Sequence, residues 1–394
     1  MSEVYLLSAV RTPIGKFLGA LSGLAAPELG SRVIREAVAR ANLPPEAVEE
    51  VFLGCVRQAG LGQNPARQAA LGAGLPPSVS AVAVNKVCGS GLQAILFGAQ
   101  AIRAGQADVI VAGGMESMSN APYLLPGIRR GARLGHGRLV DSLIHDGLWD
   151  VSNDFHMGTS CELVAERFRV SRRDMDRFAE SSHRKAVAAR REGRFRDELL
   201  ALEVPQERGE ARRVDADEGP REDTSLEKLA ALPPVFREGG LVTAGNSSQI
   251  SDGAAAVVLG SERAIRLPGA APPLGRITGW ASAGVEPRWV LVSTIDAVRR
   301  FDERHPWKAR EADLVEINEA FAGSTVAAIR ELGLDPERVN VNGGAIALGH
   351  PIGASGARIV VTLLHALRQR GLRRGMATLC MGGGNGLAVG VERS

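Results

Sequence analysis

Cys88 stands where a thiol could act as a nucleophile. It follows an apolar, strand-like run at 80–87, opens a Cys-Gly-Ser-Gly turn, and precedes small residues that predict a helix to about Ala104. Backbone N–H groups and the positive helix end would stabilise a thiolate there, so we expect a lowered pKa. Other acyl-transfer enzymes hold their nucleophile at a similar strand-to-helix turn. A small buried cysteine at a tight turn explains the local sequence equally well.

A second cysteine, Cys380, ends an apolar strand predicted at 377–381. Gly382 and two further glycines follow it, and their N–H groups could converge with the thiol on one point. Such N–H groups can form an oxyanion hole. A core cysteine at a strand end is the alternative interpretation.

His350 and Asn318 are the other two candidates for chemistry. His350 lies in a glycine-flanked loop just before a predicted helix, where it could activate a thiol or polarise a thioester carbonyl, or simply bond nearby backbone. Asn318 follows a strand and is expected to start a helix, either as an N-cap or as a site residue. Because ligands gather at the carboxyl ends of strands in open α/β sheets, all four groups are expected to share one pocket.

The elements that must position these groups alternate between strand and helix. The N-terminal region predicts strands at 4–10, 51–55 and 108–112, the last closed by Gly113-Gly114, and a helix at 26–41. Such alternation indicates a mainly parallel sheet covered by helices. The C-terminal region repeats the plan, with 339–342 entering a glycine-rich turn, a helix from about 354 and the strand at 377–381. Two similar α/β domains that arose by duplication are therefore expected.

Residues 121–249 interrupt this plan. They are rich in arginine and in loops, with helices rather than strands. Ser171 with Asp174 predicts a capping box, and the next residues place one helical face at Met175, Phe178, Ala179, Ser182, Ala186 and Val187. The stretch 207–222, dense in charges of both signs, is expected to be a solvated loop. The predicted domains are 1–120 plus 250–270, the inserted 121–249, and 271–394.

Bulk composition excludes several classes of function. The chain of 394 residues carries a net charge of +3 and only 4% aromatic residues, which is weak evidence for nucleic-acid binding. The start has no signal peptide, and no stretch reaches the apolar length of a membrane span, so a cytoplasmic location is expected. The four cysteines, at 55, 88, 161 and 380, are too far apart for a disulfide scaffold or a paired metal site. We expect free thiols and no metal.

Eight segments, in this order along the chain, together resemble the thiolase family. They are Ala9-Val10-Arg11-Thr12-Pro13, Asn85-Lys86-Val87-Cys88-Gly89-Ser90-Gly91, Gly113-Gly114-Met115-Glu116-Ser117-Met118, His156-Met157-Gly158, Thr243-Ala244-Gly245-Asn246, Asn318-Glu319-Ala320-Phe321, Gly349-His350-Pro351-Ile352-Gly353 and Cys380-Met381-Gly382-Gly383-Gly384. The resemblance implies a duplicated five-layered αβαβα fold. It also implies an inserted loop domain that covers coenzyme A.

The resemblance also implies a role for each candidate residue. Cys88 would carry the acyl group and Cys380 would exchange the α-proton. His350 and a water held by Asn318 would form one oxyanion hole, and the N–H groups of Cys88 and Gly382 a second. The positions that the family uses around coenzyme A are His156, Met157, Arg221, Ala244 and Ser248. The substrates would be acyl-CoA and coenzyme A, with no metal or redox cofactor.

Within the family, the segment from 121–126 through 145–150 resembles short-chain thiolases that form and cleave acetoacetyl-CoA and assemble as homotetramers, dimers of dimers, and the short-chain activity is therefore the one we expect. The stretch 247–249 instead resembles 3-ketoacyl-CoA thiolases of fatty-acid degradation. Residues 290–294 depart from the Met-Gly-x-Gly-Pro pattern common at that position, and Asn385 stands where other residues are usual.

Two interpretations outside these activities are possible from the sequence. One is a non-catalytic lipid- or thioester-binding relative, which would be expected to lack a reactive group, yet all four are present. The other is a decarboxylating condensing enzyme, which usually has a Cys–His–His or Cys–His–Asn set. A second cysteine in Cys-x-Gly favours a thiolase.

Overall fold

The computed structural model describes residues 2–206 and 209–393, and its centre is one large twisted sheet. The strand order is β14-β15-β16-β13-β1-β12-β5-β3-β4, with β2 beside β12. The strands are β1 Tyr5–Arg11, β2 Gly15–Lys16, β3 Glu50–Gly54, β4 Ser80–Val84, β5 Val109–Ser117, β12 Ser251–Gly260, β13 Gly275–Gly284, β14 Leu314–Ile317, β15 Arg374–Met381 and β16 Asn385–Glu392. Its two halves are joined through β1 and β13, where Tyr5 pairs with Arg276 and Leu6 with Gly275.

The two halves of the sheet have the same topology. In the N-terminal half β12 lies antiparallel between β1 and β5, and β3 runs parallel to β5 and β4. In the C-terminal half β16 lies antiparallel between β13 and β15, and β14 runs parallel to β15. At the position of β4 the second half has only a parallel bridge between Val339 and Val315, so the predicted counterpart at 339–342 is not a strand. The predicted duplication is otherwise confirmed.

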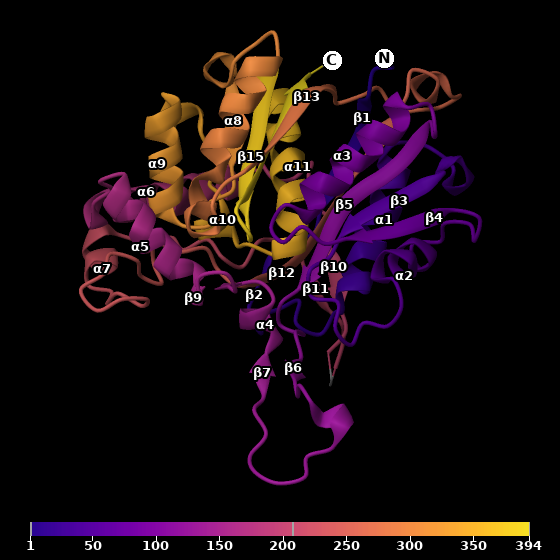
Figure 1. Cartoon of the computed structure of the whole chain (residues 1–394). Helices are drawn as coiled ribbons and strands as arrows, with labels where there is room; N and C mark the ends of the chain where they lie inside the picture. The colour runs from indigo at the N-terminus through magenta and orange to yellow at the C-terminus, as the bar shows by residue number, and fades with distance from the viewer. Residues whose placement is uncertain (1, 207–208, 394) are drawn as a thin grey trace.

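Helices separate and cover the two half-sheets, which gives the five layers (Figure 1). α3 (Ser90–Arg103) and α11 (Ile352–Arg370) form the middle layer, and α11 is buried without a break from Ile352 to Leu367. On the outer faces, α1 (Ala26–Arg40) and α2 (Pro65–Gly72) cover the N-terminal strands, while α8 (Ser293–Arg304) covers the C-terminal strands beside α9 (Ala322–Leu332). The predicted αβαβα fold is confirmed.

The stretch 121–249 forms an excursion that has helices of 11 and 20 residues but also strands of two or three residues, so the prediction of helices rather than strands was wrong for those strands. Its elements are β6 Tyr123–Leu124, β7 Val140–Asp141, α4 Ser142–His145, β8 Trp149–Asp150, β9 Phe155–His156, α5 Met157–Arg167, α6 Arg172–Arg191, β10 Leu202–Val204, β11 Arg212–Val214 and α7 Leu226–Ala230. β6 and β7 are the base of a hairpin that projects from the body (Figure 1). The predicted capping box is confirmed, because Ser171 and Asp174 cap each other at the start of α6. The predicted face of α6 is turned inward, with Phe178 partly exposed.

Shorter helices complete the chain. α10 is Ala345–Leu348, and the 3₁₀ helices are Pro45–Ala47, Ile128–Arg130, Ala264–Arg266, Pro287–Val292, Ala309–Glu311 and Pro336–Arg338. None of the helices within 2–206 and 209–393 has the length and apolar character needed to cross a bilayer.

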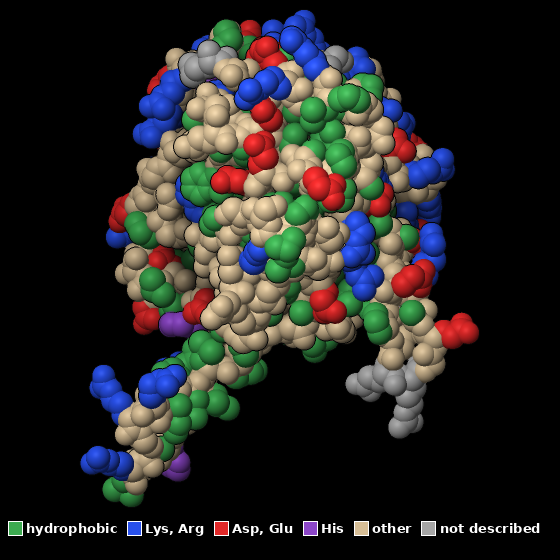
Figure 2. All heavy atoms as spheres, turned by 90° about the vertical axis from the view of Figure 1, so that its right-hand side faces the viewer, with side chains coloured by type: hydrophobic (Ala, Val, Ile, Leu, Met, Phe, Trp, Pro, Cys, Tyr) green, Lys and Arg blue, Asp and Glu red, His purple; other side chains and the backbone are tan. Residues whose placement is uncertain are grey.

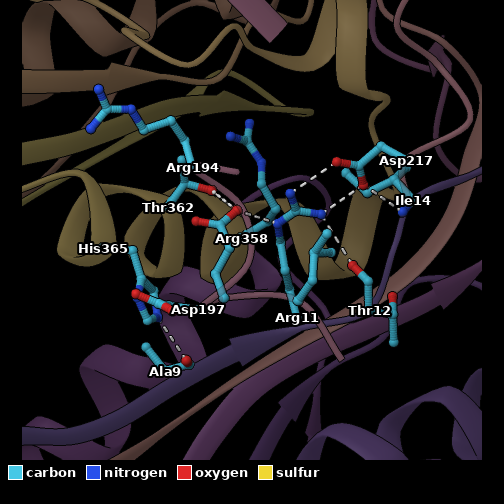
Figure 3. A network of polar contacts seen from close by, with 12 residues as sticks. Ala9, Arg11, Thr12, Ile14, Arg194, Asp197, Asp217, Arg358, Thr362 and His365 are labelled. Carbon is cyan, nitrogen blue, oxygen red and sulfur yellow. Dashed lines mark hydrogen bonds and ion pairs between the residues drawn. The ribbon is translucent and has the colours of Figure 1, made fainter. Parts of the chain in front are cut away.

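The prediction that 207–222 is a solvated loop was wrong for its second half. Glu207 lies outside the described residues, but Val214 and Asp217 are buried. Asp217 binds the fully buried Arg11 through two N–H···O bonds of 2.7 and 2.9 Å and accepts a third from Ile14 N (Figure 3). A buried guanidinium is stable only when carboxylates neutralise it. The ion pair with Arg11 therefore holds this stretch against the N-terminal core.

The prediction that Gly113-Gly114 closes a strand was also wrong, since β5 continues to Ser117. A Cβ atom on Gly114 would lie 2.1 Å from the carbonyl oxygen of Gly353, in the first turn of α11. The glycine is therefore needed for close packing rather than for a turn. This contact brings the start of α11, and with it His350, against the centre of the sheet.

Candidate active site

Cys88, His350 and Cys380 line one cavity of about 210 Å³. Gly382 lines it too. The remaining wall is mostly apolar and includes Met118, Leu148, Met157, Phe236, Val290, Leu291, Phe321, Ile352 and Met381. The structure thus brings together three of the four predicted reactive side chains in an enclosure that favours apolar groups and strengthens electrostatic interactions.

A strained turn presents Cys88 to this cavity. Val87 has φ 48°, in the left-handed region that β-branched residues rarely enter. Ser90, the first residue of α3, holds the turn, because its Oγ accepts from Lys86 N at 2.8 Å and donates to Val87 O at 2.6 Å. The predicted position of Cys88 just before a helix is confirmed.

The prediction of a lowered Cys88 pKa was wrong. Burial raises the pKa of the thiol to about 11, although the N–H groups of Gly382 and Cys88 itself and the charge of Arg57 each lower it. The cost of placing a charge in an apolar cavity outweighs these donors. At neutral pH Cys88 is a thiol, so it needs a base when it reacts.

His350 lines the same cavity and carries a ring nitrogen that is free to accept a proton. Its Nδ1 lies 2.5 Å from Ser355 Oγ, and that hydroxyl donates to Pro351 O at 2.9 Å. Since the hydroxyl has one proton, Nδ1 must donate to it, and Nε2 carries the free lone pair. Burial and the charge of Arg358 lower the pKa of His350 to about 3, so the imidazole is neutral and able to accept a proton.

Asn318 directly follows β14 and lies next to His350. Its Nδ2 is 3.4 Å from His350 Nε2, and its buried Oδ1 has no hydrogen-bond partner in the described residues. The prediction that Asn318 starts a helix was wrong, because α9 begins at Ala322. The next residue, Glu319, accepts bonds from Ser182 Oγ at 2.7 Å and Asn340 Nδ2 at 2.8 Å, which fix the chain beside Asn318.

Cys380 is the penultimate residue of β15 and is 3% exposed. Burial and the proximity of Cys88 raise its pKa, so both thiols are protonated at rest. After Gly382 the chain turns through Gly383 and Gly384, with φ 80° and 83°, where only glycine is unstrained. This turn directs the Gly382 N–H to the Cys88 sulfur.

The five predicted coenzyme A positions divide between two adjoining cavities. His156, Met157 and Ser248 line the cavity that holds Cys88, whereas Arg221 and Ala244 line a second one of about 130 Å³. Gln249 lines both cavities. Its Nε2 donates to carbonyl oxygens of Ile346 and Ala347 at 3.0 and 3.1 Å, which fixes the side chain at the junction.

Each cavity has a distinct chemical character. In the first, the His156 ring stacks on Phe236 at 4.7 Å, and burial lowers its pKa, so it offers a flat neutral surface. In the second, Arg221 supplies positive charge, while Lys228 is paired at 2.6 Å with Asp223, which lines the cavity too. A ligand with an apolar arm and an anionic end would match the pair.

Several site residues were missed from the sequence. Gln249 stood out only as part of 247–249, with no role assigned to it, and Phe236 gave no local signal beyond its type. Glu116 could have been noticed as an acidic residue in an apolar strand; it accepts from Arg57 N at 2.9 Å and Gly353 N at 2.8 Å. It thereby ties the loop after β3 to the start of α11. Within the described ranges, no group of three or more His, Cys, Asp or Glu side chains is arranged to hold a metal.

The fold and the cavity together indicate a thiol-dependent acyltransferase. The cavity combines two thiols, a neutral imidazole and N–H donors, and the fold is a duplicated five-layered α/β fold. Comparison with protein families agrees with this class. The model "Thiolase, N-terminal domain" matches residues 4–263, and "Thiolase, C-terminal domain" matches residues 271–393. The chain belongs to the thiolase family.

Individual relatives match along the whole chain. An "Acetyl-CoA acetyltransferase" of Pseudomonas aeruginosa is 53% identical over 393 residues, covering 100% of both chains. A "Probable acetyl-CoA acetyltransferase" of Escherichia coli is 52% identical, again covering 100% of both. The crystal structure of the Bacillus anthracis acetyl-CoA acetyltransferase superposes with a TM-score of 0.97 at 43% identity, covering 100% of this chain and 99% of the other.

Proposed function

We propose that this thiolase catalyses the reversible condensation of two acetyl-CoA molecules to acetoacetyl-CoA and coenzyme A, by a ping-pong mechanism through acyl-Cys88. The observation that carries the proposal is the placement of Cys88, Cys380 and the neutral His350 on one cavity. The names of the full-length relatives support the same activity.

In the first half-reaction Cys88 Sγ attacks the thioester carbonyl while His350 Nε2 takes the thiol proton. The N–H groups of Cys88 and Gly382 stabilise the oxyanion that forms. The C–S bond to coenzyme A then breaks, the leaving thiolate takes the proton from His350, and the acetyl group remains on Cys88. This covalent intermediate holds the first acyl group while the second thioester enters.

In the second half-reaction Cys380 first gives its thiol proton to solvent, and the thiolate then removes an α-proton from the second acetyl-CoA. A thioester α-hydrogen is only weakly acidic, so the enolate oxygen needs donors, which we assign to His350 and a water bound to Asn318 Oδ1. Ser355 Oγ can donate as well as accept, so it can support the tautomer in which Nε2 carries the proton. The enolate carbon attacks acetyl-Cys88, and the C–S bond to Cys88 breaks to release acetoacetyl-CoA. The Cys88 thiolate then takes up a proton from solvent and returns to its resting thiol.

Coenzyme A would run through the two adjoining cavities. Its pantetheine arm would pass His156, Met157 and Ser248, and its phosphates would lie near Ala244 and Arg221. The two thiols, the imidazole and the N–H donors supply every step, so we propose that no metal or redox cofactor takes part.

We further propose a cytoplasmic homotetramer built as a dimer of dimers. The projecting hairpin between β6 and β7 exposes apolar side chains among its arginines (Figure 2). Tyr123 is 65% exposed, Leu139 63%, and Leu134 fully exposed. Exposed apolar groups on a projecting hairpin indicate a contact surface for a second dimer.

The test is to incubate the enzyme with coenzyme A and 3-ketoacyl-CoA substrates of increasing chain length, following thioester loss. We expect the highest kcat/KM for acetoacetyl-CoA. A strong preference for long chains would favour the alternative, a 3-ketoacyl-CoA thiolase of fatty-acid degradation, toward which 247–249 points. No thioester loss with any substrate would favour the non-catalytic relative.

A further inference from the structure

Arg57 is a buried cation that has no role in the reaction steps proposed above. It follows β3 and is 4% exposed. Its Nη2 donates to the carbonyl oxygen of Leu143, while Nε and Nη1 have no partner in the described part of the chain. A buried guanidinium with one hydrogen bond is costly, and such a cost is expected to have a structural or functional reason.

The guanidinium of Arg57 packs directly against Gly147, in the wall of the Cys88 cavity. A Cβ atom on Gly147 would lie 2.0 Å from Arg57 Nη2 and 2.6 Å from Cζ and Nη1. Gly147 does not have a left-handed φ, so its backbone has no need of glycine. The close approach of the arginine is the feature that requires it.

This contact supports one side of the cavity. Gly147 and Leu148 line the cavity, and Leu148 O accepts from the backbone N–H of Met157 at 2.8 Å. Arg57 therefore links the N-terminal core, through Leu143 and Gly147, to the inserted segment that encloses the substrate. Its own backbone is held in turn by Glu116.

We propose that Arg57 is a positioning residue for the thiolase reaction, which holds segment 143–148 as a wall of the acyl cavity and places a positive charge beside Cys88. The inference rests on the proposed function. The charge of Arg57 lowers the pKa of Cys88, whereas Glu116 raises it. Other charged or titratable groups near Arg57 or Cys88 are Cys55, Asp141, Asp146, His350 and Cys380.

The charge is tested by the pH profile of Cys88 alkylation by iodoacetamide, followed on its peptide by mass spectrometry. Arg57→Met should lower the rate at pH 8 about tenfold, the effect of one pKa unit on the thiolate fraction. Arg57→Lys should restore most of that rate, because it keeps the charge, but should still raise KM, because an ammonium cannot lie flat against Gly147. The control is Arg103→Met, at a half-buried arginine that stacks on Trp280; it should leave both values unchanged.

The contact is tested by a double-mutant cycle. Gly147→Ala should raise KM for acetoacetyl-CoA several-fold in the wild-type background, since the new Cβ displaces the guanidinium. In the Arg57→Met background the same substitution should have little further effect. A wild-type alkylation rate in Arg57→Met, or additive effects in the double variant, would overturn the proposal. Because alkylation does not require turnover, a wild-type enzyme that lacks thiolase activity would refute the proposed function separately. If Arg57→Met does not fold, Gly147→Ala alone decides, and wild-type KM would overturn the proposal.

Discussion

Replacing Asp217 should destabilise the whole fold although it lies in a highly charged stretch. Its carboxylate binds Arg11 twice and Ile14 N once, and both side chains of the ion pair are at most 2% exposed. Burial lowers the pKa of Arg11, but Asp217 and Glu198 raise it by more, so the guanidinium remains charged. Asp217→Ala would leave two guanidinium N–H groups and one backbone N–H without an acceptor.

The expected size follows from these lost partners. Removing one member of a buried ion pair costs about 3–5 kcal/mol. An unfolding entropy of about 2.1 cal/mol/K per residue gives roughly 0.8 kcal/mol/K for 394 residues, so the melting temperature should fall by about 4–6 °C. Because the pair is shielded from solvent, the loss should persist at high salt.

The assay is thermal unfolding of the wild type, Asp217→Ala and a control variant, each at low and at high salt. The matched control is Asp215→Asn, which removes an exposed carboxylate paired with Arg213 at 3.2 Å; it should change stability by about 0.5 kcal/mol at most. A melting temperature for Asp217→Ala that equals that of the control would refute the reasoning.

Three further predictions concern the site and the assembly. The alkylation rate of Cys88 should rise about tenfold per pH unit from pH 7 to 10, because deprotonation increases as pH approaches the pKa of about 11; a plateau below pH 9 would contradict this. Mass spectrometry after mixing with acetyl-CoA should find the acetyl group on the Cys88 peptide, and Cys88→Ala should fold but not turn over; an acetyl group only on Cys380 would reverse the assignment. Light scattering should give a tetramer that Leu134→Asp converts to dimers, and a wild-type monomer at micromolar concentration would end the assembly hypothesis.

The positions of the main site residues could be predicted from the sequence, because local glycine turns and strand ends mark them. Cys88, His350 and Cys380 each lie beside such a turn, and the fold brings them to one cavity. What the sequence could not predict depends on contacts between distant segments. The pKa of Cys88 is set by burial among residues of several elements, and neither half of the Arg57–Gly147 contact has a local signal. Likewise, the density of charges suggested a solvated loop at Asp217. Its partner, Arg11, lies 206 residues earlier in the chain, so no local pattern could reveal the pair.

The central claim is that the two thiols have different roles: Cys88 carries the acyl group and Cys380 moves the α-proton. A serine hydroxyl is far less acidic than a thiol, so Cys380→Ser should abolish condensation and thiolysis while Cys88 can still be acetylated. The decisive measurement is to incubate Cys380→Ser with acetyl-CoA in deuterated water and to determine both Cys88 acetylation and deuterium in the acetyl methyl group. The account predicts acetylation with little deuterium; uptake at the wild-type rate would contradict it and make His350 the base.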